Sequence, residues 1–88
     1  MAGKDFTVQI VKRIGVIREL DNGWMRELNI VSWNGADPKY DVREWSPDHE
    51  RMSRGITLTS EEMSSLCTLY VTNMDESEKV MKENEAHE

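Results

Sequence analysis

The sequence predicts an α+β fold in which a four-stranded antiparallel curved sheet is followed by one amphipathic α-helix (ββββα). Apolar and polar residues alternate in several segments of the first 57 residues, and turn-forming residues separate these segments. Thr59 followed by Glu62 is a capping box, which marks the start of a helix. After that point apolar residues recur every three or four positions, so the spacing of apolar residues changes from that of a strand to that of a helix.

The first strand is expected to begin at Phe6. Phe6, Val8 and Ile10 share one parity, and Ile14 and Val16 continue it, so the segment predicts one long strand or two short ones.

The second strand is expected over residues 24–33, after a turn at Asn22 and Gly23. This pair suits the positive φ angles of a tight hairpin. The interior of the strand, residues 28–33, is rich in β-forming residues but does not alternate cleanly, which allows a bulge there.

The third and fourth strands follow a break at residues 34–38. Tyr40 and Val42 alternate with polar residues in the third strand, which Pro47 ends. The loop over residues 46–53 is charged and is expected to be mobile. Gly55 opens a short apolar strand over residues 56–58.

The helix carries an apolar stripe that predicts packing against the sheet or against a second copy. The stripe consists of Met63, Leu66, Tyr70 and Met74, with Cys67 among them. It is wide enough to cover one face of a small sheet and to leave the other face for function. We expect a domain over residues 1–74, and over residues 75–88 an acidic tail that is either a frayed helix or disordered.

The charge of the chain is unevenly distributed. Its 88 residues carry a formal net charge of -6, from 11 basic and 17 acidic residues. Residues 1–57 hold nine of each sign, whereas residues 58–88 hold two basic and eight acidic residues. The first two thirds are therefore neutral, so the placement of their arginines can still produce a positive face.

Composition and motifs favour a cytoplasmic binding protein over an enzyme. A single cysteine excludes an intrachain disulfide framework and a cysteine-based zinc site, and no segment reaches the length of a membrane span or a signal peptide. The sequence shows no phosphate-binding glycine loop, no nucleophile elbow and no spaced His and Cys set. We therefore expect no catalytic residues, no metal and no cofactor.

Residues 39–58 carry the pattern most suggestive of function. They interleave arginine side chains with a tryptophan, and a surface of this kind can hold phosphates and stack unpaired bases at the same time. The residues concerned are Arg43, Trp45, Arg51 and Arg54.

This arrangement of segments resembles the single-stranded-DNA-binding domain of the positive cofactor four family of transcriptional coactivators, and in particular its bacterial YdbC-type branch. The resemblance covers about residues 6–69 and rests on the order of several pieces: RELN (26–29), VSWN (31–34), PKYD (38–41), DVREW (41–45), WSPDHE (45–50) and GITL (55–58), followed by the capped helix.

The resemblance implies a homodimer, formed through the helices and sheets, that binds single-stranded DNA in preference to duplex. It implies nucleic-acid contacts by Arg43, by Trp45 at the aromatic end of the third strand, and by Arg54 before the fourth strand. Further contacts are implied in the regions of Arg26, Asn29, Trp33 and Lys39, with Arg51 in the basic turn. The helix residues Met63, Leu66, Tyr70 and Met74 are expected in the core or the dimer interface.

Two functions remain open from the sequence. In the first, the sheet binds single-stranded DNA with little sequence preference, because cationic side chains neutralise phosphates and aromatic rings stack on bases. In the second, the chain is a protein-interaction module, for example toward transcription or replication proteins, and its binding of DNA or of single-stranded RNA is incidental. The acidic net charge favours the second.

Overall fold

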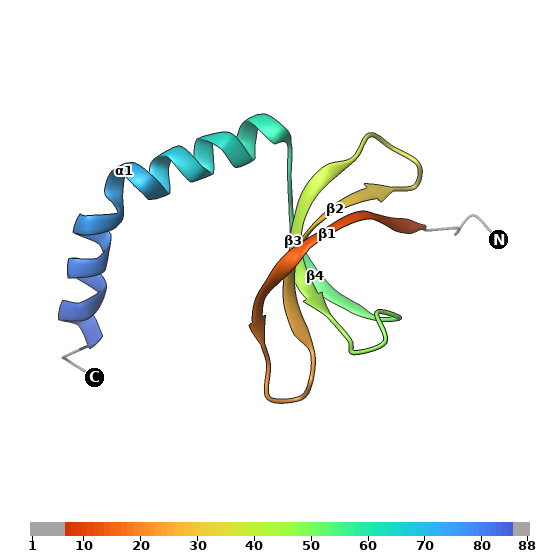
Figure 1. Ribbon diagram of the computed structural model, residues 1–88, viewed down its shortest axis with the longest axis horizontal. Helices are drawn as coiled ribbons and strands as arrows, with labels where there is room; N and C mark the ends of the chain where they lie inside the picture. Colours follow the sequence, from red (N-terminus) through yellow and green to blue (C-terminus); the bar gives the residue numbers. More distant parts are fainter. Residues whose placement is uncertain (1–6, 86–88) are drawn as a thin grey trace.

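Four strands in chain order form one curved antiparallel sheet, and a single helix follows them (Figure 1). The computed structural model describes residues 7–85. Its elements are β1 (Val8–Glu19), β2 (Met25–Trp33), β3 (Lys39–Trp45), β4 (Met52–Leu58) and α1 (Ser60–Glu85). The sheet order is β1-β2-β3-β4, so each strand pairs with its neighbour in sequence. This confirms the predicted ββββα fold; the expected strand start at Phe6 lies outside the described residues.

The irregular pairing of the first hairpin lies in β1 and not in β2, where the sequence allows a bulge. The register of β1 against β2 shifts three times, and β1 has one extra residue at each shift: Val11, Ile14 and Ile17. Each extra residue of a bulge reverses the parity of the residues after it and bends the strand. Arg13 therefore pairs with Asn29, and Val16 with Glu27. The reversals at Val11 and Ile14 cancel, so Val8, Ile10 and Val16 pair with alternate residues of β2 and share one face, whereas Ile14 is an extra residue of a bulge.

The first two hairpin turns use glycine differently from the prediction. In the first turn, the N–H of Gly23 donates to the carbonyl O of Leu20 (3.0 Å), and only Gly23 has a positive φ, of 89°. This is a three-residue loop that ends in a left-handed glycine. In the second turn, Asn34 (φ 50°) and Gly35 (φ 77°) are both left-handed, so the tight pair predicted for residues 22 and 23 occurs at residues 34 and 35.

The sheet has two chemically different faces. The cross-strand pairs place one set of side chains on what we call the polar face, and the alternate residues on what we call the apolar face. The polar face includes Glu27, Asn29, Val31, Trp33, Lys39, Asp41, Arg43, Trp45 and Thr57. The apolar face consists of Leu28, Ile30, Tyr40, Val42, Ile56 and Leu58.

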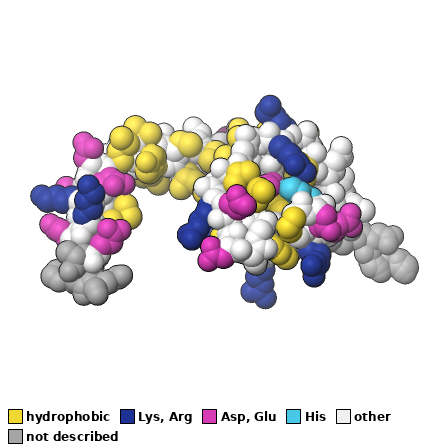
Figure 2. Space-filling view, turned by 60° about the horizontal axis from the view of Figure 1, so that its bottom comes forward, with side chains coloured by type: hydrophobic (Ala, Val, Ile, Leu, Met, Phe, Trp, Pro, Cys, Tyr) yellow, Lys and Arg dark blue, Asp and Glu magenta, His cyan; other side chains and the backbone are white. Residues whose placement is uncertain are grey.

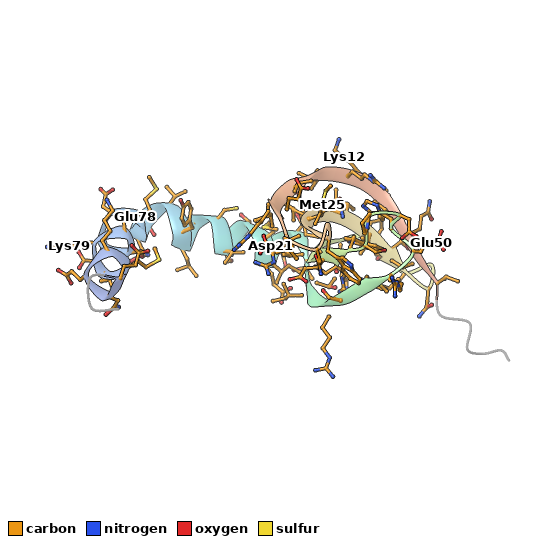
Figure 3. The ribbon with its side chains drawn as sticks, turned by 90° about the horizontal axis from the view of Figure 1, so that it is seen from below. Lys12, Asp21, Met25, Glu50, Glu78 and Lys79 are labelled. Atoms are coloured by element: carbon orange, nitrogen blue, oxygen red, sulfur yellow. The ribbon has the colours of Figure 1, made fainter. Side chains whose placement is uncertain are left out.

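The polar face is the more buried of the two. Glu27, Asn29 and Asp41 are each exposed by 4% or less, whereas the residues of the apolar face are half-buried or exposed. The bent β1 lies over the β2 part of this face, where its residues Arg13 and Val16 line one groove with Glu27 and Asn29. In Figure 3 Lys12 points outward from β1, while Met25 lies under its curve.

Helix α1 begins with the predicted capping box. The N–H of Glu62 donates to Oγ1 of Thr59 (3.0 Å), and the N–H of Thr59 donates to Oε1 of Glu62 (2.8 Å). These two bonds satisfy donors that the first turn of a helix leaves without partners.

The helix continues through the acidic segment to Glu85, so residues 75–85 extend α1 and do not form a second helix. Figure 1 shows a bend about halfway along it. At that level Oγ1 of Thr72 donates to the carbonyl O of Thr68 (2.8 Å), and Nδ2 of Asn73 donates to that of Leu69 (2.9 Å). Side chains that bond to carbonyl groups in this way often bend helices.

Helix α1 extends away from the sheet and does not cover a face of it. Within the described chain it contacts only β3 and β4, near its own start, and none of its residues is buried. The expectation that the helix packs across its own sheet was therefore wrong. Figure 2 shows hydrophobic side chains exposed along the part of the helix nearest the sheet. No described helix is long and apolar enough to cross a membrane.

Candidate nucleic-acid interface

Arg43 is held on the polar face by a bidentate ion pair. Its Nε and Nη2 donate to Oδ1 and Oδ2 of Asp41, each at 2.7 Å, and its Nη1 donates to the carbonyl O of Ser53 at 3.1 Å. The side chain of Asp41 is fully buried and that of Arg43 is 11% exposed. Thr57 donates a further hydrogen bond to Oδ2 of Asp41 (2.9 Å). The guanidinium group therefore has a fixed position and a nearby counter-charge.

Gly55 provides the space that Arg43 occupies. The two residues are cross-strand partners in β3 and β4. A Cβ atom at position 55 would overlap the Cβ of Arg43 and the carbonyl O of Val42. Because the φ of Gly55 is not left-handed, its requirement is for space and not for conformational freedom.

Trp33 lies against the guanidinium group of Arg43. The guanidinium carbon lies 4.6 Å from the centroid of the indole ring, within the range of a cation–π contact. Asp41, Arg43 and Trp33 thus form one rigid unit of carboxylate, cation and aromatic ring, which we call the Arg43–Trp33 unit.

Trp45 is part of the core. It is 3% exposed, and its ring stacks on that of His49 with 5.6 Å between centroids and 26° between planes. His49 in turn lies 2.9 Å from Oε2 of Glu27 through its Nε2. The proposed stacking of Trp45 on a base stays a prediction, and it requires the ring to become exposed.

The loop between β3 and β4 is tightly hydrogen-bonded, contrary to the mobile loop expected from its charge. Oγ of Ser46 donates to Oδ1 of Asp48 (2.8 Å) and accepts from the N–H of Arg51 (2.9 Å). The N–H of Glu50 donates to the same carboxylate (2.9 Å). The hydrogen bonds from Glu50 and Ser46 hold the pKa of Asp48 below its ordinary value. His49, with a φ of 60°, completes the loop.

A groove of about 510 Å³ lies on the polar face between the arch of β1 and the β3–β4 loop. We call it the β1 groove. Arg13 and Val16 of β1 and Pro47 and His49 of the loop form its sides, and Glu27 and Asn29 of β2 belong to its lining. Among residues 7–85 no cluster of His, Cys, Asp and Glu has the composition of a metal site.

Comparison with known proteins places this arrangement in a family. Residues 20–69, more than half of the chain, match the family model described as Transcriptional Coactivator p15 (PC4). The chain belongs to this coactivator family. It is also 44% identical over 62 residues to a protein of Treponema pallidum (strain Nichols) described as uncharacterized, a match that covers 70% of this chain and 73% of that protein. Membership supports DNA binding and a transcription-cofactor-like, non-enzymatic role.

The segment matched to the coactivator family contains every nucleic-acid contact predicted from the sequence, but the structure divides these residues into three groups. Trp33, Arg43, Asn29 and the buried Trp45 lie on the polar face, where Trp33 touches Arg43. Lys39, Arg51 and Arg54 are exposed, and the guanidinium carbon of Arg51 lies 5.9 Å from the Trp24 ring centroid.

Arg26 belongs to the third group, since it lies on the opposite face from Arg43. Its Nη2 forms an ion pair with Oε2 of Glu44 at 2.7 Å, with both side chains partly exposed. Successive side chains in a strand point to opposite faces of the sheet. Because Arg26 pairs with Glu44 and Arg43 pairs with Glu27, residues 26 and 43 cannot contact the same stretch of a bound strand.

Sequence reasoning missed the residues that position the Arg43–Trp33 unit. These are Asp41, Ser53, Gly55 and Thr57. The signal was present in part, because Asp41 precedes Arg43 by two residues in a strand and therefore lies on the same face. Arg13, Glu27 and His49 of the β1 groove were missed as well, because the bulges of β1 determine which residues face it.

Proposed function

We propose that this chain binds single-stranded DNA with the polar face of its sheet, in transcription regulation or another part of DNA metabolism in the cytoplasm. The Arg43–Trp33 unit is the observation that supports this most directly. It presents an aromatic ring with a fixed cation over one of its faces, within the segment that matches the coactivator family. Rings and cations in this arrangement bind bases and phosphates of single strands with little dependence on sequence.

Arg43 keeps part of its hydrogen-bonding capacity for a ligand. A guanidinium group has five N–H donors, and Asp41 and Ser53 occupy three of them. The two others can serve a phosphate oxygen. Asp41 reduces the attraction of Arg43 for phosphate, so most of the electrostatic binding is expected from the exposed cations Lys39, Arg51 and Arg54.

We also propose that the domain acts as a homodimer. Val42, Ile56 and Leu58 of the apolar face and Leu66 and Leu69 of α1 line a groove of about 610 Å³. Along the helix, Leu66, Leu69 and Tyr70 are each exposed by 50% or more. Exposed apolar surface of this extent is typical of protein interfaces. The same surface favours the alternative in which the chain binds a transcription or replication protein.

The test is fluorescence anisotropy with a labelled oligo-dT of about 20 nucleotides, a few times the site size of one binding fold. It is run at two salt concentrations beside a duplex and an oligo-U of equal length. We expect salt-sensitive binding to the DNA single strand and weak binding to the duplex. Absence of binding at low salt contradicts the proposal and leaves the protein-interaction alternative. Equal binding of oligo-U extends the ligand to RNA.

A charge-matched pair of variants locates the binding face. Replacing the exposed Arg54 with Ala should weaken binding severalfold and make the salt dependence shallower by about 0.7 in logarithmic slope, because one phosphate contact is lost. Lys79→Ala removes the same charge from α1, outside the segment matched to the family. Equal effects of the two substitutions would show that only net charge matters and would contradict the assignment to the sheet.

A further inference from the structure

The β1 groove has the size and lining of a small-ligand site. Its volume of about 510 Å³ lies within the range of pockets that take molecules of nucleotide size. Val16, Met25 and Pro47 give it apolar walls, and Arg13 lines it from β1. Among the described residues no carboxylate forms an ion pair with Arg13, which is exposed.

The two polar residues that β2 contributes to the groove, Glu27 and Asn29, offer acceptors. Nδ2 of Asn29 donates to Oε1 of Glu27 (3.0 Å), and Oε2 of Glu27 lies 2.9 Å from Nε2 of His49. Oδ1 of Asn29 is buried, and none of residues 7–85 donates a hydrogen bond to it. A buried oxygen without a partner is uncommon in folded proteins. A carboxylate and this amide oxygen therefore line the groove as acceptors beside each other.

The groove is also adjacent to the surface proposed for the DNA strand. Glu27 is the cross-strand partner of Arg43, and Asn29 is that of Asp41, so both belong to the same face as the Arg43–Trp33 unit. A strand that stacks on this unit would carry its neighbouring nucleotide past the groove.

We propose that the β1 groove takes one unpaired base of the bound strand and prefers guanine, an inference that rests on the proposed single-stranded DNA binding. Guanine offers two adjacent donors, N1–H and the N2 amino group, which match the paired acceptors of Glu27 and Asn29. Thymine offers one N–H between two carbonyl oxygens, which would face the carboxylate. Adenine and cytosine each offer one amino group beside an acceptor and are expected to rank between the two. Arg13 is placed to hold the adjoining phosphate.

The test compares four labelled strands that differ in one position, an oligo-dT of about 20 nucleotides with a central dG, dA, dC or dT. Anisotropy should show at least fivefold tighter binding of the dG strand than of the all-dT strand, the lower bound for one bidentate contact to a base. Equal affinities would overturn the groove proposal and leave Glu27 and Asn29 the single role of holding the β3–β4 loop. Binding of none of the strands would overturn the proposed function as well.

A pair of exposed valines on β1 provides the matched variants. Val16→Trp fills the groove from its wall and leaves Glu27 and Asn29 unsubstituted, and it should abolish the preference for dG while binding of the all-dT strand persists. Val11→Trp makes the same change on β1 away from the lining of the groove, and it should leave the preference intact. Circular dichroism checks that both variants fold. A preference that survives Val16→Trp would place guanine recognition elsewhere and overturn the proposal.

Discussion

At the scale of single residues, the position of Arg43 depends on a glycine that touches no ligand. Substitution of Gly55 by Ala inserts a methyl group into space that the Arg43 side chain and the carbonyl O of Val42 already occupy. We expect the free energy of unfolding to fall by about 1 to 3 kcal/mol, as for other overpacked sites, and DNA binding to weaken because Arg43 is displaced. Urea denaturation of the variant measures the first effect.

Gly15→Ala is the control for this substitution. Gly15 also lies in a strand and is not left-handed, but a Cβ there meets no atom within 4 Å. Its stability should stay within about 0.5 kcal/mol of the parent. If both alanine variants lost the same stability, strand propensity and not the contact with Arg43 would explain the loss.

Sequence predicted which residue types occur in the candidate site better than it predicted their surroundings. Arg43 and Trp33 were both expected to contact nucleic acid, and they do lie in contact with each other. Asp41 escaped notice because its importance comes from complete burial beside Arg43, which no local pattern shows. The burial of Trp45 involves the β3–β4 loop, which brings His49 over its ring. Contacts made by bulges and loops are not encoded in a local pattern.

At the scale of elements, sequence patterns predicted an interaction reliably where the two interacting residues are close in sequence. The capping box of α1 is an example, because Thr59 and Glu62 are three residues apart. The three register shifts of β1 are the opposite case, since they depend on its pairing with β2. The length of α1 was also missed, because the acidic composition of residues 75–85 gave no apolar stripe from which to predict a continuous helix.

The cap makes a prediction about the start of α1. Thr59→Ala removes the hydroxyl that accepts from the N–H of Glu62, and it should lower stability by about 1 kcal/mol. Thr59→Ser keeps the acceptor and should retain most of the stability. The midpoint of urea denaturation, measured for both variants, distinguishes the loss of the hydrogen bond from the loss of the methyl group. Equal losses would contradict a capping role for the hydroxyl.

At the scale of the whole molecule, the chain has too little core for its size. Among the described residues the buried hydrophobic side chains are Val31 and Trp45. The radius of gyration of 16.2 Å exceeds the roughly 12 Å of a compact domain of this length, because α1 projects from the sheet. Small domains with a thin core commonly gain stability by association. The apolar face and the apolar residues of α1 are the surfaces available for it.

Tyr70 is the residue that tests this association most directly, because it is 63% exposed and its replacement removes little from the isolated chain. If two copies pack through α1, Tyr70→Glu changes both sides of the interface at once. A loss of about 2 kcal/mol per copy, usual for a buried interface tyrosine, raises the dimer Kd by about 10³. Light scattering coupled to size-exclusion chromatography should show the molar mass fall from two chains to one. Thr68→Glu adds the same charge on the opposite side of α1 and should leave the dimer intact. A monomeric parent would contradict the homodimer, whereas a dimer that survives Tyr70→Glu would move the interface from α1 to the sheet.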